Sequence, residues 1–158
     1  MPLDSSHVGR EYGPYHYALG AEKMREFAFA IAGGLPSSTF GSPPAGLNPL
    51  FYEEEAAQRG PYGALIAFPT FAVNFAMKPF TEALADPELE VELIRVVHGE
   101  QEFEFHEVMR AGDVMTTRGR ISRILEKGSL TFVVMETQSH NQHGRLVVTG
   151  TWTAIIRR

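Results

Sequence analysis

The strongest constraint on the fold is a strand pattern in the C-terminal part of the chain. From Arg145 to Ile156, two sets of residues alternate, one mainly large and apolar and the other rich in threonine. This period of two is typical of an antiparallel strand with one buried face. The expected inward face consists of Leu146, Val148, Gly150, Trp152, Ala154 and Ile156. Such a face requires neighbouring strands and an apolar layer to cover it.

The neighbouring strands are expected in the segment after Leu89. Strand-like residues run over 130–139, and the sequence Asn-Gln-His-Gly at 141–144 is typical of a hairpin turn into the last strand. Two more segments, 113–125 and 92–106, complete a predicted antiparallel meander.

The apolar layer is expected from a helix that begins at Pro69. The residues from Pro69 to Lys78 are apolar on nearly every side, which indicates a buried helix. Pro79 is expected to kink or end it. The apolar run 64–77 is too short and too interrupted for the roughly 20 residues of a membrane span. The sequence therefore predicts an α+β architecture, a curled antiparallel sheet around a central apolar helix.

The N-terminal half adds shorter elements. We expect a helix over 21–32, a Gly-, Pro- and Ser-rich loop over 33–46, and a short helical segment that starts at Asn48-Pro49 and ends at Gly60. The buried face predicted for the first helix comprises Met24, Phe27, Ala28 and Ile31.

Composition limits the function. The 158 residues suit one domain spanning 1–158. Lys and Arg number 14 against 19 Asp and Glu, a net charge of −5, which argues against a nucleic-acid partner. The chain has no cysteine, so thiolate metal sites and a cysteine nucleophile are excluded. The first residues do not show a secretory signal, and we expect a cytoplasmic protein.

Four stretches together resemble a known family. They are Val-Gly-Arg-Glu-Tyr at 8–12, Ala-Phe-Pro-Thr-Phe at 67–71, His-Gly-Glu-Gln-Glu-Phe-Glu-Phe at 98–105, and Arg-Ala-Gly-Asp-Val at 110–114. In this order they resemble the MaoC-like dehydratases of hot-dog fold, in particular N-terminal-type, non-catalytic subunits related to mycobacterial 3-hydroxyacyl-thioester dehydratases. The resemblance implies R-specific dehydration of 3-hydroxyacyl thioesters, or the reverse hydration, on coenzyme A or acyl carrier protein, with no other cofactor.

The catalytic pattern of that family is incomplete here. Active members carry Asp-x-Asn-Pro-(apolar)-His, whose Asp and His transfer protons. The matching residues are Gly46, Asn48, Pro49 and Phe51. Asn48 and Pro49 match, but neither Gly46 nor Phe51 can transfer a proton. The resemblance therefore implies a substrate-binding subunit whose partner brings the catalytic pair.

Other residues are candidates for binding or catalysis. Phe68, Pro69, Thr70, Phe71 and Phe75, at the start of the central helix, are expected to contact the acyl thioester. Amides at a helix start can bind a carbonyl oxygen, but Pro69 removes one of them. His98 and Gly99 are further binding candidates. His98 has a structural alternative, hydrogen-bonded near the helix, with Gly99 allowing a close backbone approach. His140 and His143 lack a third ligand, so no metal site is predicted.

Three functions remain open at this point. The first is the substrate-binding subunit, as a homodimer or as a heterodimer with a catalytic hot-dog subunit, joined through exposed strand edges into one continuous sheet. The second is a self-sufficient hydratase or thioesterase that uses His98 and Glu100. The third is a non-enzymatic module that binds acyl thioesters.

Overall fold

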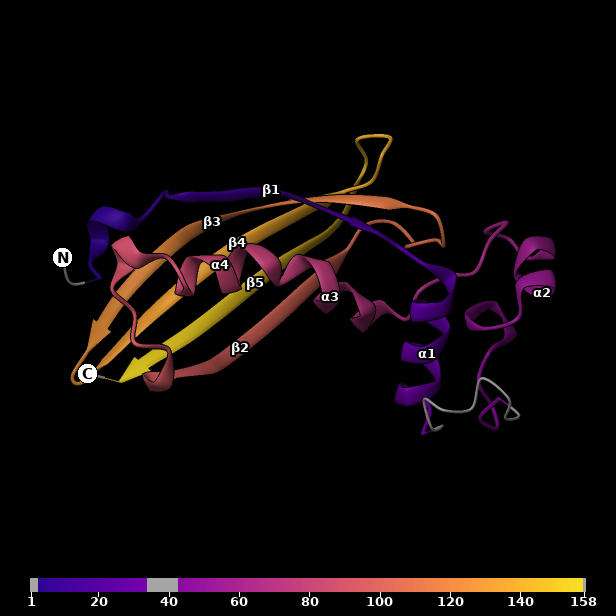
Figure 1. The fold of residues 1–158 in the computed structure, drawn as a ribbon, viewed down its shortest axis with the longest axis horizontal. Coiled ribbons are helices and arrows are strands. Elements are labelled where there is room, and N and C mark those ends of the chain that lie inside the picture. Colours follow the sequence, from indigo (N-terminus) through magenta and orange to yellow (C-terminus); the bar gives the residue numbers. More distant parts are fainter. Residues whose placement is uncertain (1–2, 34–42, 158) are drawn as a thin grey trace.

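The computed structural model describes residues 3–33 and 43–157, and five antiparallel strands form one sheet in the order β1-β3-β4-β5-β2 (Figure 1). Consecutive strands β3, β4 and β5 pair as the predicted meander. The edge strands β1 and β2 pair with β3 and β5. The strands are β1 Glu11–Ala18, β2 Val96–Phe105, β3 Val114–Lys127, β4 Leu130–His140 and β5 Leu146–Arg157.

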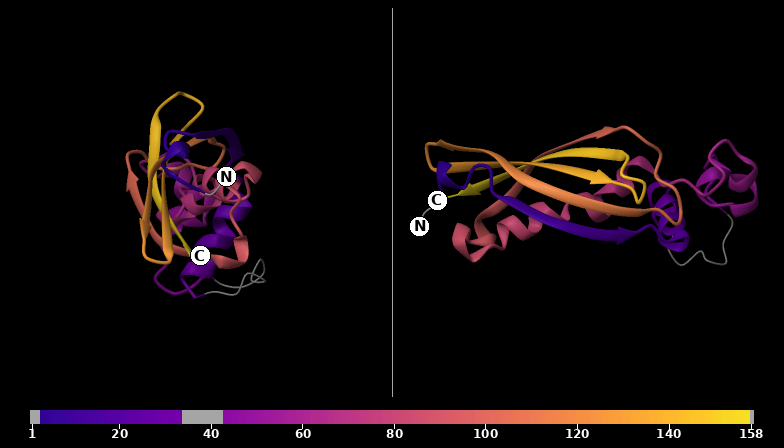
Figure 2. Two further views of the ribbon diagram at one scale, coloured as in Figure 1. Left: turned by 90° about the vertical axis from the view of Figure 1, so that its left-hand side faces the viewer. Right: turned by 90° about the horizontal axis from the view of Figure 1, so that it is seen from above.

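Two short helices, α3 and α4, lie along the inner face of the curved sheet (Figures 1 and 2). Helices α1 and α2 lie beyond the end of the sheet that is opposite to the chain termini. The α-helices are α1 Ala21–Ile31, α2 Glu54–Arg59, α3 Val73–Ala76 and α4 Lys78–Leu84. Turns of 3-10 helix span Ser5–His7, Pro49–Phe51, Pro69–Ala72, Pro87–Leu89 and Leu93–Arg95. Each helix in the described ranges is too short or too polar to cross a membrane.

The core lies between the helices and the inner face of the sheet. Phe71, Phe75 and Phe80 from the helical segment belong to the same buried cluster as Trp152 of β5. The rings of Phe80 and Trp152 are stacked, with centroids 5.7 Å apart, and the Trp152 indole donates a hydrogen bond of 2.9 Å to Thr137 Oγ1. The predicted α+β hot-dog architecture, a curled antiparallel sheet around a central apolar helix, is therefore confirmed.

The helix approaches the sheet most closely where β3 carries a glycine. A Cβ atom at Gly119 would lie 2.4 Å from Cβ of Pro79 and 3.0 Å from the sulfur of Met135. Real Cβ atoms do not approach other atoms this closely, and the proline ring cannot rotate away. Only glycine therefore allows α4 to sit at this depth.

The central helical segment differs from the prediction. It is divided into a 3-10 turn, α3 and α4, and it continues past Pro79 to Leu84. Pro79 is in the first turn of α4, where its missing N–H would have no intrahelical acceptor and its fixed φ suits a helix. The helical segment is thus interrupted at Met77, just before Pro79, but Pro79 begins α4 and does not end the segment.

Three other expectations are corrected. The aromatic stretch at residues 12–17 lies within strand β1, which the sequence analysis did not predict because Gly13-Pro14 interrupts the pattern. Strand β2 begins at Val96, after a 3-10 turn that takes up Leu93–Arg95. Ile31, predicted to be buried, is 50% exposed at the end of α1, and Phe29 is buried instead. Most of the predicted 33–46 loop lies outside the described residues.

A polar cluster fastens β1 to the turn after α4. The Tyr12 hydroxyl donates to Asp86 Oδ2 at 2.8 Å, and the Arg10 guanidinium contacts the same oxygen at 2.7 Å and Glu88 at 2.6 Å. Burial, together with the hydrogen bond to Asp86, raises the pKa of the Tyr12 phenol. Burial alone would raise the pKa of Asp86, but hydrogen bonds from the Glu88 amide and Tyr12 and the Arg10 charge lower it overall.

Replacing Gly119 with alanine tests the close approach of α4. We expect the free energy of unfolding to fall by about 1–3 kcal/mol, because either Pro79 or the strand must move. Gly20→Ala is the matched control, because a Cβ there meets nothing within 4 Å and the φ angle of −81° is allowed for alanine. Urea unfolding measures both variants. Equal stability of the two variants would contradict the close approach.

The Asp86 carboxylate predicts a pH dependence. Its folded-state pKa is lowered relative to the unfolded chain, so its stabilisation is present above the unfolded value of about 3.9 and is lost as pH falls through the folded value. Asp86→Asn should therefore melt at a lower temperature than wild type at pH 7, and the difference should shrink below about pH 4. A difference that stays constant from pH 7 to about pH 3 would contradict this assignment.

Candidate functional site

An apolar cavity of about 200 Å³ lies at the start of the central helical segment. Its walls come from the Pro49–Phe51 turn, from the residues before α3, and from the end of β2 with the loop that follows. The lining residues are Phe51, Ile66, Ala67, Pro69, Phe105, Glu107, Val108 and Met109. Small-molecule pockets usually measure about 300–1,000 Å³, so this cavity is small for a complete site.

Backbone hydrogen bonds hold the walls of the cavity together. The Ala67 amide donates to the Met109 carbonyl at 2.9 Å, and the Ala111 amide donates to Leu65 at 2.8 Å. The Ile66 amide donates to the Leu50 carbonyl at 3.1 Å, which joins the 3-10 turn to the same wall. The cavity is thus built from three segments that are far apart in the sequence.

The residues of the family pattern lie at this wall. Asn48 caps the 3-10 turn, because its side-chain oxygen accepts the Leu50 amide at 3.0 Å. This places the Phe51 ring against Phe68, with centroids 4.9 Å apart. Phe51 thus puts an apolar ring where active relatives are expected to carry histidine.

Gly46 precedes this turn in a left-handed conformation. Its φ is +81°, and a Cβ atom there would meet nothing within 4 Å. The position is exposed and contributes no side chain to the cavity. Among the lining residues, Glu107 is the single titratable one, and it forms a 3.2 Å ion pair with Arg145. The arrangement can enclose an apolar group, but it has no acid-base pair facing that group.

The predicted binding residues of the central helix divide into two groups. Pro69 lines the cavity, Phe68 contacts Phe51, and Thr70 is exposed at the start of the helical segment. Phe71 and Phe75 are buried in the core and are not part of the lining. The Phe71 amide donates to Phe68 at 2.8 Å, so this amide is not available to a carbonyl oxygen of a substrate.

The His98-Gly99-Glu100 stretch lies on edge strand β2. His98 faces inward opposite Ala154, and its ring lies 5.6 Å from Phe80 and 6.0 Å from Trp152, measured between centroids. Within the described residues, His98 makes these ring contacts and not the hydrogen bond that its structural alternative predicted. Since Phe105 is seven residues further along the strand, His98 lies on the order of 20 Å from the cavity end.

A β-bulge at Gly99 separates His98 from Glu100. Pairing shifts between these two residues, so Glu100 lies opposite Thr153 on the outer face. The two side chains therefore point to opposite sides of the sheet, and the structure does not bring them together. A Cβ at Gly99 would lie 2.8 Å from the Ile155 side chain and 3.3 Å from the Thr153 carbonyl oxygen, so the closest neighbour at this glycine is a side chain and not the backbone.

Several lining residues were not predicted from the sequence. Ile66, Phe105, Val108 and Met109 are ordinary apolar residues, and only the pairing of 65–67 with 109–111 brings them together. The bridge between Ile66 and Arg110 is a long-range contact without a local sequence signal. The stretches at 67–71 and 98–105 were recognised, but their shared cavity was not.

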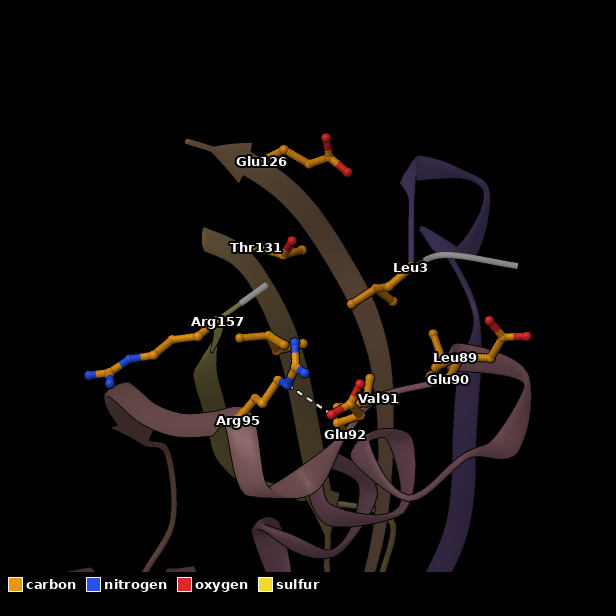
Figure 3. A pocket seen from close by; sticks show the side chains of 10 residues that line it. Leu3, Leu89, Glu90, Val91, Glu92, Arg95, Glu126, Thr131 and Arg157 are labelled. Atoms are coloured by element: carbon orange, nitrogen blue, oxygen red, sulfur yellow. Dashed lines mark ion pairs between the residues drawn. The ribbon is translucent and has the colours of Figure 1, made fainter. Parts of the chain in front are cut away.

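Further hollows lie outside this cavity, and two of them have volumes of about 430 Å³ or more. The first, of about 510 Å³, is polar and adjoins the apolar cavity through Glu107; its lining includes Arg110, His143 and Arg145. The second, of about 430 Å³, lies at the end near the termini, where the Arg95–Glu92 ion pair crosses it (Figure 3). It contains none of the predicted site residues. No group of three His, Asp or Glu side chains suited to a metal ion occurs within residues 3–33 and 43–157.

This geometry defines the class of protein, a hot-dog scaffold with an apolar site beside its central helix. The family described as FAS1-like, dehydratase domain region, matches residues 6–150, and the chain belongs to this hot-dog dehydratase family. A UPF0336 protein of Saccharopolyspora erythraea is 37% identical over 99% of this chain and 93% of its own length. Another, from Streptomyces coelicolor, is 34% identical over 100% and 97%.

Solved structures agree with this assignment. The crystal structure of the C-terminally truncated HadBC (3R-hydroxyacyl-ACP dehydratase) complex from Mycobacterium tuberculosis has a chain that matches with a TM-score of 0.76 and 27% identity, over 97% of this chain and 99% of that chain. An (R)-hydratase from A. caviae involved in PHA biosynthesis matches with a TM-score of 0.64 over 96% and 97%. At 18% identity, the second match shows the fold alone.

Proposed function

We propose that this chain is the substrate-binding, non-catalytic subunit of an R-specific 3-hydroxyacyl-thioester dehydratase, or enoyl-thioester hydratase. The observation that carries the proposal is the apolar cavity lined by Phe51, whose ring packs against Phe68 at the position expected for the catalytic histidine. Membership of the hot-dog dehydratase family supports the reaction class.

The chemistry explains why this cavity requires a partner. Elimination of water across the α and β carbons needs a base for the α proton, an acid for the departing hydroxyl group, and donors to the thioester carbonyl. Phe51 and Gly46 supply neither proton-transfer group. Glu107 is already engaged by Arg145. The cavity can therefore hold the acyl chain while another subunit moves the protons.

The substrate class follows from two adjoining hollows. An acyl thioester has an apolar chain joined to a polar arm that ends in phosphate, in coenzyme A as in acyl carrier protein. The apolar cavity would take the chain, and the polar hollow with Arg110 and Arg145 would take the arm, with Glu107 at their common wall. The reaction needs no cofactor beyond this carrier.

The partner would complete the cavity from the side of β2. Phe105 is the last residue of β2, lines the cavity, and is 44% exposed. A second hot-dog subunit paired with this edge would cover Phe105 and add its own residues to the small cavity. The similar HadBC chain was solved as a complex, which supports this arrangement.

Hydration assays test the proposal directly. The purified chain should not hydrate crotonyl-coenzyme A above background, because acid-base groups each contribute about 10²–10⁴-fold and both are absent. Mixing with a hot-dog protein that carries the intact Asp-x-Asn-Pro-x-His pattern should produce activity. Replacing the partner's histidine with alanine should remove it.

The controls separate the alternatives. His98→Ala in this chain should have a smaller effect than the loss of the partner's histidine, because His98 packs on Trp152 away from the cavity. Hydration by this chain alone that His98→Ala abolishes would overturn the proposal and favour the self-sufficient enzyme. Tight binding of acyl-coenzyme A without activity in any mixture would instead favour a pure binding module.

A further inference from the structure

The two edges of the sheet differ in their ability to pair with another strand. The outer edge of β1 contains Pro14, which has no N–H to donate, and its pairing with β3 shifts between Tyr12 and Tyr15. Strand β2 runs for 10 residues without proline, and β5 is its single hydrogen-bonded neighbour among the described elements. Because irregular, proline-containing edges resist strand addition, β2 is the edge open to a partner.

The outer face of β2 carries a row of carboxylates. Glu100, Glu102 and Glu104 alternate along the strand, opposite threonines of β5, and we call them the acidic row. All three side chains are exposed. Within the described residues, no cation lies at ion-pair distance from any of them.

The cations on the same face of the sheet are distant. Arg157 ends β5, four residues beyond the partner of Glu100, which is about 13 Å along the strand. Arg118, Arg120 and Arg123 lie on β3, which β4 and β5 separate from β2. Three interstrand steps of about 4.8 Å amount to about 14 Å, beyond the screening length of about 8 Å at physiological salt. Arg120 is also paired with Glu136 at 3.6 Å. The acidic row is thus not neutralised by its own subunit.

The acidic row opposes pairing between two copies of this chain. In an antiparallel pair, residues directly opposite each other project from the same face, about 4.5–5.5 Å apart at Cβ. Two copies of β2 could pair edge to edge about a two-fold axis that passes between positions 100 and 104, with their outer faces on the same side. In each such register, a glutamate of one copy stands opposite a glutamate of the other. Centring on Glu102 opposes all three carboxylates at once. Like charges in such positions are destabilising.

Apolar residues on both sides of the acidic row still favour burial of this edge. Leu93 and Ile94, just before β2, are 59% and 94% exposed, and Val97 and Phe105 are 47% and 44% exposed. Covering these side chains with a partner strand would remove apolar surface from water, which is favourable. The edge is therefore suited to a partner, but its charge disfavours a second copy.

We propose that the acidic row selects a heteromeric partner whose paired strand carries lysine or arginine on its outer face. This inference rests on the proposed function for the nature of the partner, a hot-dog subunit. Opposite charges placed directly across the strand pair stabilise it, whereas the same row opposes self-association.

Self-association of the chain tests the proposal without partner or substrate. The triple variant Glu100→Gln, Glu102→Gln, Glu104→Gln removes the repulsion at nearly constant shape. Sedimentation equilibrium should show that it dimerises at least about tenfold more tightly than wild type. Wild-type self-association should strengthen as salt rises from about 0.05 to 0.5 M, and that of the variant should not.

A matched control removes the same charge elsewhere. Glu26→Gln, Glu53→Gln, Glu54→Gln changes three exposed carboxylates on or beside α1 and α2, and it should self-associate like wild type. If the acidic-row variant is unstable, the single variant Glu102→Gln should show the same trend. Self-association that is equal in wild type and acidic-row variant, or strengthened equally in the control, would overturn the proposal.

The partner provides the second measurement. Changing the acidic row to lysine should weaken the complex with the catalytic hot-dog partner by at least about tenfold, while lysine at positions 26, 53 and 54 should not. A partner that binds the acidic-row lysine variant as tightly as wild type would overturn this inference. If that complex is still active, the proposed function stands although this inference fails. A complex that shows the expected charge dependence but is inactive would support this inference and contradict the proposed function.

Discussion

The contact between Pro79 and Gly119 sets the depth at which the helical segment sits in the sheet. Because β3 offers no side chain at Gly119, the proline ring reaches the strand backbone, and Phe80 can stack on Trp152 beside it. The same seating buries Phe71 and Phe75 against the inner face. The depth of α4 in the curled sheet therefore depends on one missing Cβ atom.

The position of the helical segment also determines the shape of the cavity at the end of the sheet. The helical segment starts at Pro69. Its first residue, the Pro49–Phe51 turn and the end of β2 surround a small apolar cavity that no side chain of the described residues fills. Phe105 belongs both to the cavity and to the open strand edge. The apolar cavity and the open edge of β2 are thus continuous, which is the arrangement expected of a subunit that binds substrate for a catalytic neighbour.

The sequence was informative where patterns are local. The alternation in 145–156 predicted β5 and its buried face, and Asn48-Pro49 predicted a helix start that the Asn48 cap confirms. Strand β1 was not predicted because Gly13-Pro14 breaks the alternation. Its strand conformation comes from pairing with β3, which local β propensity does not reveal. The cavity walls could not be predicted, because they form only when 65–67 pairs with 109–111.

The central claim is that this chain binds an acyl thioester but cannot move its protons. The most direct measurement is hydrogen exchange at the α carbon of 3-hydroxybutyryl-coenzyme A, followed by NMR in D₂O with the chain alone at saturating concentration. The account predicts ligand line broadening, which reports binding, with no incorporation of deuterium above the buffer rate. Deuterium incorporation that requires the chain would show a resident base and would contradict the account.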